Sequence, residues 1–205
     1  MTPILLFIGM IIISYFIGCF SMARLIAKFF KSLNIYKVGT GHPDTQNIYQ
    51  NVDKGLGIMV GIVDFGKIYI YLAILKFLHN PLPIFAPITT LNHLLILGFF
   101  IVVGHCLPIT HHFKGGRGIF SYLGYITFFF VNYFSPWPVL IVVVLAIIVV
   151  LGFKQYRFAQ FMIVLLPPFI NFFFEGSGTT LAKFFIAALL MGIMNVFVSK
   201  RLGEI

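Results

Sequence analysis

Long apolar segments, separated by short polar stretches, constrain this chain more than any other feature. We count seven of them, near residues 3–29, 57–78, 91–107, 119–133, 138–153, 159–174 and 181–199. A helix needs roughly 20 apolar residues to cross a bilayer, so a chain of 205 residues holds six or seven spans and little else. Three segments have only 15 or 16 residues and would cross tilted or in a thinned bilayer. We therefore predict seven spans, with six as the alternative.

The composition agrees with a membrane protein. Hydrophobic residues make up 60% of the chain and charged residues 9%, and the mean hydropathy is +1.04. A soluble domain carries about 25% charged residues. We predict an all-α, polytopic membrane protein in which residues 1–205 form a single transmembrane domain. The first segment should remain as a helix, because it is too long for a cleavable signal peptide and lacks a basic start.

Lysine and arginine residues predict the orientation in the membrane. With seven spans, one face carries Arg24, one turn inside the first segment, together with Lys28, Lys31, Lys37, Lys54, Lys114, Arg117, Lys154, Arg157, Lys200 and Arg201, whereas only Lys76 and Lys183 flank the other. Positive residues accumulate in cytoplasmic loops, so the loops and the C-terminus on that face are predicted to be cytoplasmic. The net charge of +9 then reflects topology and anionic lipid, and we expect no nucleic-acid partner.

A basic, glycine-rich turn lies between the third and fourth segments and reads Lys114-Gly115-Gly116-Arg117-Gly118. Glycines allow successive backbone N–H groups to converge on an oxyanion, and the lysine and arginine add positive charge. Two interpretations stay open at this point. The turn is either a phosphate-binding loop or a set of positive residues placed at a membrane boundary by topology alone.

Asp64, Lys67 and His105 are ionisable residues inside apolar segments. Asp64 and Lys67 are three residues apart, so they share one face of a helix and can pair. Charges within a span are costly unless they are paired or face a cavity, so the pair is either structural or the lining of a polar substrate pocket. His105, at the end of the third segment, is either a packing residue or a base.

No metal site is predicted. Cys19 and Cys106 lie within or beside apolar segments without the spacing of metal ligands. The adjacent His111 and His112 point apart in an extended chain, so they make a poor metal pair.

Several motifs occur together in one order. The sequence Gly104-His105-Cys106-Leu107-Pro108 is followed by Phe113-Lys114-Gly115-Gly116-Arg117-Gly118, and Asp64 with Lys67 and the first-loop residues Gly39, Gly41 and Asn47 precede them. These resemble the G-H-x-F-P, F-K-G-G-K-G, D-x-x-K and first-loop motifs of the acyl-phosphate-dependent glycerol-3-phosphate acyltransferases of bacterial membranes, the PlsY type. The resemblance spans nearly the whole chain.

The resemblance implies a seven-span fold in the bacterial cytoplasmic membrane and an acyltransferase activity. A fatty acyl group would pass from acyl phosphate to the 1-hydroxyl of glycerol 3-phosphate, giving lysophosphatidic acid and inorganic phosphate in contact with membrane lipids. It implies no cofactor. The catalytic residues it implies are Lys114, Arg117, His105 and Thr40. The substrate-binding residues it implies are Gly39, Gly41, Asn47, Asp64, Lys67, Gly115, Gly116, Gly118, Arg157, Arg201 and Glu204.

Some polar positions differ from the family pattern. The family's serine is Thr40, its first-loop arginine is Gln50, and its C-terminal histidine falls on Asn195. In an active, divergent enzyme Thr40 keeps a hydroxyl and Arg157 supplies the charge missing at Gln50. The alternative is an inactive paralogue that serves as a structural or regulatory subunit of a larger membrane protein complex. A small transporter is disfavoured, because no repeated halves or broken helices are visible.

Overall fold

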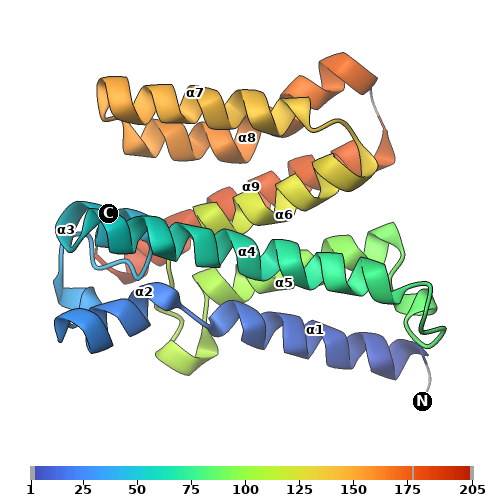
Figure 1. Cartoon of the computed structure of the whole chain (residues 1–205), viewed down its shortest axis with the longest axis horizontal. Coiled ribbons are helices and arrows are strands. Elements are labelled where there is room, and N and C mark those ends of the chain that lie inside the picture. The colour runs from blue at the N-terminus through green and yellow to red at the C-terminus, as the bar shows by residue number, and fades with distance from the viewer. Residues whose placement is uncertain (1–2, 177, 204–205) are drawn as a thin grey trace. The chain divides into compact units, whose positions relative to one another are not determined.

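The computed structural model describes residues 3–176 and 178–203, and within them every regular element is helical (Figure 1). In chain order the elements are α1 Pro3–Cys19, α2 Met22–Leu25, the π-helical η1 Ile26–Phe30, the 3-10 helix η2 Ile35–Lys37, α3 Thr45–Asn51, α4 Lys54–Leu78, the 3-10 helix η3 Ala86–Ile88, α5 Leu91–Cys106, the 3-10 helix η4 Ile109–His111, α6 Ile119–Tyr133, α7 Trp137–Phe153, α8 Tyr156–Glu175 and α9 Thr179–Arg201. The prediction of an all-α membrane fold is confirmed.

Among the described residues, five stretches are long and apolar enough to cross a bilayer, and they contain α1 with α2 and η1, α4, α5, α8 and α9. Helices α6 and α7 are also apolar, but they have only 15 and 17 residues. The count of seven spans therefore stays a prediction.

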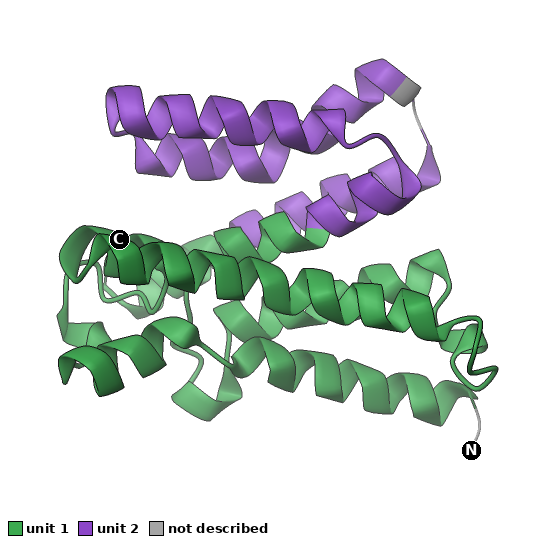
Figure 2. Cartoon of the chain, in the orientation of Figure 1, with its two compact units in different colours: residues 1–125, 194–205 green, residues 126–193 purple. Residues whose placement is uncertain are grey.

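The chain divides into two compact units (Figure 2). Unit 1 comprises residues 1–125 and 194–205, and unit 2 comprises residues 126–193, so the boundaries fall inside α6 and α9. The expectation of a single transmembrane domain over residues 1–205 stays a prediction.

The first apolar segment is not one continuous helix, contrary to the simplest interpretation of its sequence. It stops at Cys19 and resumes at Met22, because Ser21 adopts an extended conformation and its Oγ accepts a hydrogen bond from Arg24 N at 3.4 Å. This is the geometry of a helix N-cap. The interruption leaves the carbonyl of Phe20 outside a helix, where it accepts a hydrogen bond from Lys67 Nζ at 3.1 Å.

Helices α1 and α5 approach each other closely through glycines. A Cβ atom on Gly18 would overlap the carbonyl oxygen of Ile101, and one on Gly104 would overlap the carbonyl oxygen of Tyr15. Small residues at such contacts let helices in a membrane pack backbone against backbone. The contact places the end of α5, and with it His105, beside the break after α1.

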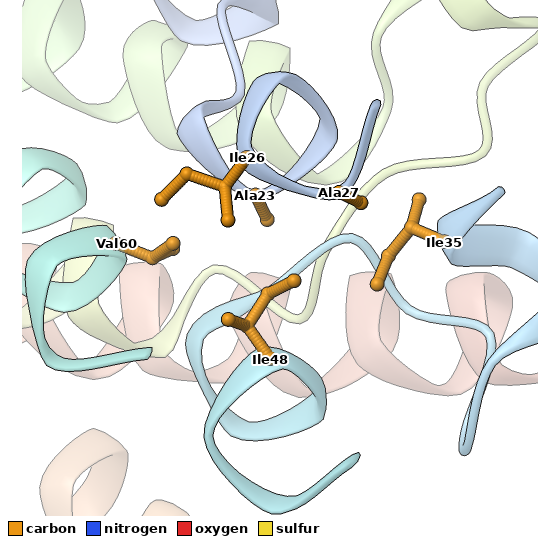
Figure 3. Close-up of a cluster of buried hydrophobic side chains, with 6 residues drawn as sticks. All are labelled: Ala23, Ile26, Ala27, Ile35, Ile48 and Val60. Carbon is orange, nitrogen blue, oxygen red and sulfur yellow. The ribbon is translucent and has the colours of Figure 1, made fainter. Parts of the chain in front are cut away.

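The predicted first loop, residues 31–55, is an ordered part of unit 1 and contains η2, α3 and the start of α4. A buried apolar cluster joins it to the first segment (Figure 3); its members are Ala23, Ile26, Ala27, Ile35, Ile48 and Val60. Two aspartates cap the helices of this loop. Asp44 Oδ1 accepts a hydrogen bond from Asn47 N, and Asp53 Oδ1 accepts one from Leu56 N; each is 2.9 Å long. Burial and capping together fix the backbone that carries the first-loop motif.

Unit 2 is held mainly by apolar and aromatic contacts. Helices α7 and α8 pack along each other, and the ring of Phe184 lies 5.8, 5.4 and 5.9 Å from the rings of Phe129, Phe130 and Phe134. These distances are typical of aromatic pairs. Arg157 lies exposed in the first turn of α8, so it belongs to this unit.

Candidate functional site

The basic glycine-rich turn, residues 113–118 and called the glycine loop below, follows α5 and η4 and leads into α6. Gly115 packs on the carbonyl oxygens of His105 and Cys106, and Gly116 packs on the His105 ring and the carbonyl of Pro43, so that neither position has room for a Cβ atom. Gly118 has a φ of +74°, a conformation that favours glycine. The glycines therefore permit close packing as well as an unusual backbone path.

The backbone donors of the glycine loop are largely unused. Gly115, Gly116 and Gly118 are buried, yet their N–H groups donate to no acceptor among the residues that the structure describes. Buried backbone N–H groups are nearly always paired in native proteins. An oxyanion bound at this loop would supply the acceptors that the protein does not.

Arg117, one of the expected catalytic residues, is buried and paired within the protein. Its Nη1 lies 3.4 Å from Asp44 Oδ2 and donates to Gln46 Oε1 at 3.1 Å. Its backbone N–H also donates to Asp44 Oδ2, at 3.4 Å. The arginine thus fastens the glycine loop to the start of α3, and Asp44 offsets its charge.

Lys114 differs from Arg117 in its surroundings. Its carbonyl accepts a hydrogen bond from Tyr36 Oη at 3.0 Å, which holds the backbone of the loop against η2. Its side chain is exposed, and its ammonium group has no partner among the described residues. Lys114 is therefore the cation of the glycine loop that remains available to an anion.

Asp64, Lys67 and His105, called the buried triad below, form one hydrogen-bonded cluster. Lys67 Nζ lies 2.9 Å from Asp64 Oδ1 and 2.9 Å from His105 Nδ1, and it also donates to the Phe20 carbonyl. The exposed fraction of each of these side chains is 8% or less. Three acceptors thus match the three N–H donors of the ammonium group. The structural interpretation of the Asp64–Lys67 pair fits this geometry, with His105 as its third member.

The triad also sets the proton position on His105. An ammonium donor at Nδ1 requires that nitrogen to accept, so the proton of the neutral ring is assigned to Nε2. Nε2 is the ring atom nearest to Gly116. His105 therefore presents a hydrogen-bond donor, rather than a base, to the glycine loop.

In the first loop the side chain of Asn47 is fully engaged. Its Nδ2 donates to the carbonyls of Val38 and His42, each at 2.9 Å, and its Oδ1 accepts from Thr40 N at 3.2 Å and from Asn51 Nδ2 at 2.9 Å. These four bonds use the hydrogen-bonding capacity of the amide. The structure thus assigns Asn47 to shaping the loop.

Four further first-loop residues were singled out from the sequence. Gly39 and Gly41 have φ values of +54° and +74°, and Thr40 lies half-buried between them with its Oγ1 3.5 Å from His42 N. Gln50 is exposed and accepts from Gln46 Nε2 at 3.0 Å. The glycines provide the left-handed turns that bring the Thr40 backbone to Asn47.

Helix α9 contacts the glycine loop at two points. Asn195 Nδ2 donates to the carbonyl of Arg117 at 3.2 Å, and the guanidinium of Arg201 lies 5.5 Å from the ring of Phe113 and 5.6 Å from that of Phe197. The second contact has the geometry of a cation–π interaction. Arg201 is thus brought to the site as a packing residue of the loop.

Two other expected site residues are not placed here. Glu204 lies outside the described residues. Arg157 belongs to unit 2, whereas the site described here is built from unit 1 alone. Among the residues that the structure describes, no three His, Cys, Asp or Glu side chains gather in a way that could hold a metal ion.

Sequence reasoning missed Asp44, Gln46 and Tyr36 as partners of the glycine loop. The aspartate carried a usable signal, because Asp44-Thr45-Gln46-Asn47 has the pattern of a helix N-cap. Nothing in the sequence indicates that the second carboxylate oxygen of Asp44 reaches Arg117, 73 residues further along the chain.

Comparisons with known proteins agree on one family. Residues 8–201 match the family model described as glycerol-3-phosphate acyltransferase. The chain is 28% identical to a glycerol-3-phosphate acyltransferase of Nitrosospira multiformis over 90% of this chain and 86% of that protein. It is 30% identical to glycerol-3-phosphate acyltransferase 5 of Dehalococcoides mccartyi over 97% of this chain and 78% of that protein.

A solved structure shares the fold. The crystal structure of PlsY, an integral membrane glycerol 3-phosphate acyltransferase, in its glycerol 3-phosphate form aligns with a TM-score of 0.73 over 95% of this chain and 88% of that chain. The sequence identity is 22%, so this likeness concerns the fold alone.

Proposed function

This chain belongs to the glycerol-3-phosphate acyltransferase family, and from that membership we propose that it transfers a fatty acyl group from acyl phosphate to glycerol 3-phosphate. The 1-hydroxyl oxygen of glycerol 3-phosphate attacks the acyl carbonyl carbon, and the bond from that carbon to the phosphate oxygen breaks. Lysophosphatidic acid forms, inorganic phosphate leaves, and the hydroxyl proton passes to phosphate or water. Both substrates carry a phosphate group, so the site must hold anions.

One observation carries this proposal. Within the described part of the chain, the N–H donors of the buried residues Gly115, Gly116 and Gly118 are unused, and the ammonium group of Lys114 in the same loop has no partner. Phosphate oxygens satisfy such donors well, because a run of backbone N–H groups and a nearby cation attract an anion together. The interpretation of this turn as a topology signal alone leaves the buried donors unexplained.

The remaining site residues are assigned by their contacts. Lys114 binds the phosphate, and the Nε2–H of His105 beside Gly116 is a further donor to bound phosphate or to the oxyanion of the transition state. Asp64 and Lys67 orient His105 through its Nδ1. Arg117 holds the loop in place rather than binding the substrate directly. The hydroxyl of Thr40 is proposed as a substrate contact of the first loop.

Membrane orientation follows from the distribution of positive residues. We place the protein in the bacterial cytoplasmic membrane with the glycine loop, the first loop and the C-terminus in the cytoplasm. In this arrangement glycerol 3-phosphate reaches the loop from water. The acyl tail of acyl phosphate remains in the bilayer while its head group reaches the same loop.

The test is phosphate release from palmitoyl phosphate by the purified chain in lipid nanodiscs, with and without glycerol 3-phosphate. We expect release that requires glycerol 3-phosphate and yields lysophosphatidic acid. Lys114→Ala should lower the rate by roughly 100-fold or more, as for loss of a charged group at a transition state. Lys54→Ala is the matched control, because Lys54 is also exposed but lies at the start of α4. No release from folded protein would contradict the proposal and favour an inactive paralogue.

A further inference from the structure

Arg24 is a half-buried cation that the site described so far does not use. We propose that its guanidinium is a second phosphate-binding group of this site, acting with Lys114 on the phosphate of a substrate. This inference rests on the proposed acyltransferase function and adds a specificity-determining residue to it.

The side chain of Arg24 is anchored at one end and unsatisfied at the other. Its Nη2 donates to the carbonyl of Cys19 at 2.5 Å, where α1 stops. Its Nη1 is buried and has no hydrogen-bond partner among the described residues. A buried charged donor without an acceptor costs free energy, so a protein that keeps one usually has a ligand for it.

Contacts of the same short helix place Arg24 beside the glycine loop. Ser21 Oγ accepts from Arg24 N and donates to the carbonyl of Pro43, each at 3.4 Å. That carbonyl is one of the groups against which Gly116 packs. The guanidinium is therefore anchored in the neighbourhood of the unused N–H groups.

The buried cations of unit 1 are already neutralised. Arg117 pairs with Asp44, and Lys67 pairs with Asp64. Arg24 forms no ion pair with a carboxylate among the described residues, and its positive charge is therefore not offset. The break after α1 is what permits this position, because it lets a new helix, capped by Ser21, start at Met22 and carry Arg24 in its first turn.

The ligand class follows from the chemistry of the group. A guanidinium held at one nitrogen still presents N–H donors in a planar fork, which suits the oxygens of a phosphate monoester or an acyl phosphate. The first-loop segment from Gly39 to Gln50 carries no lysine or arginine. Arg24 therefore supplies a positive charge that this loop does not provide.

The experiment measures KM for glycerol 3-phosphate and for palmitoyl phosphate, and inhibition by inorganic phosphate, for Arg24→Gln and Arg24→Lys in nanodiscs. Arg24→Gln should raise one of the two KM values about tenfold or more and weaken phosphate inhibition, the effect of losing one charged hydrogen bond. Arg24→Lys should recover part of the loss, because it restores the charge without the fork. Lys37→Gln, an exposed cation of η2, is the matched control and should change neither value.

Unchanged KM values and phosphate inhibition in folded Arg24→Gln, with the wild-type chain active, would overturn the inference and leave the proposed function standing. An effect confined to the dependence of the rate on phosphatidylglycerol would also overturn it, because Arg24 would then bind a lipid headgroup. If the wild-type chain releases no phosphate, the proposed function itself fails. Calorimetric binding of glycerol 3-phosphate and of palmitoyl phosphate then tests Arg24 alone, and unchanged affinity for both ligands in Arg24→Gln would overturn the inference.

Discussion

The buried triad and the glycine loop are neighbours in unit 1, yet they use their hydrogen-bond donors in opposite ways. Every N–H of the Lys67 ammonium meets an acceptor, whereas three backbone donors of the loop meet none among the described residues. A cluster that satisfies itself specifies the packing of helices. A loop whose donors stay unpaired is prepared for a ligand, and the comparison separates structure from binding within one site.

The largest effect is expected from a change in the buried triad, whose Lys67 donors all have acceptors within the protein. Lys67→Met leaves the Asp64 carboxylate buried with only His105 near it, 3.6 Å away, so it should destabilise the protein by about 3–5 kcal/mol. The double variant Asp64→Asn with Lys67→Met removes both charges, so it should lose less stability than Lys67→Met alone. Thermal unfolding in detergent measures both. Equal losses would show that the two charges do not depend on each other.

The next largest effect is expected from Gly116→Ala, which tests whether the glycine loop needs its glycines for packing. In Gly116→Ala the new Cβ meets the His105 ring and the Pro43 carbonyl, and overpacking of this kind costs about 1–3 kcal/mol. The acyltransferase rate of Gly116→Ala should fall together with its stability. Gly9→Ala in α1 is the control, since apart from neighbouring residues and the backbone of its own helix no described atom lies within 4 Å of its new Cβ. A stable, active Gly116→Ala protein would mean that the loop has another conformation.

A smaller effect concerns the tether from α9. Asn195→Ala removes the donor to the Arg117 carbonyl and should cost about 1 kcal/mol. Hydrogen exchange of residues 113–118 should speed up while that of α4 stays unchanged. Lys200→Ala, exposed in the same helix, serves as the control. If the protection of residues 113–118 from hydrogen exchange does not change, the contacts with Asp44 and Tyr36, and not Asn195, hold the loop in place.

The smallest expected effect comes from Arg201. Arg201→Gln loses the contacts with the Phe113 and Phe197 rings, which are worth about 0.5–1 kcal/mol at an exposed site. Thermal unfolding of Arg201→Gln, compared with that of the control variant Lys200→Gln, measures this loss of stability. A large loss of activity without a loss of stability would instead indicate that Arg201 contacts the substrate.

Hydropathy predicted most of the helices. The expected segments 91–107 and 119–133 correspond to α5 at Leu91–Cys106 and α6 at Ile119–Tyr133, because polar or glycine residues follow or precede these apolar runs. Helix α4 begins at Lys54, three residues before the expected 57, since the cap at Asp53 extends it beyond the apolar run. The break after Cys19 was missed because hydropathy averages over Ser21 and does not detect a cap.

The site was predicted less completely than the fold. The glycine loop was found because glycines and cations occur together in five consecutive residues, and the Asp64–Lys67 pair because its members are three positions apart. Contacts between site residues that lie far apart in the chain could not be predicted, because they leave no local pattern in the sequence. Arg117 was expected to meet a phosphate, and only the structure places Asp44 beside it. The same holds for Lys67 and His105, which are 38 residues apart.

The tether from Asn195 to the glycine loop also sets an order of events during biosynthesis. The amide that holds the Arg117 carbonyl is translated 78 residues after it, which takes about 4–16 s at ordinary ribosome speeds of roughly 5–20 residues per second. During that interval a nascent chain carries the loop without its α9 contacts. The ribosome therefore delivers a membrane-inserted intermediate first, and a fully tethered loop arises only when α9 arrives.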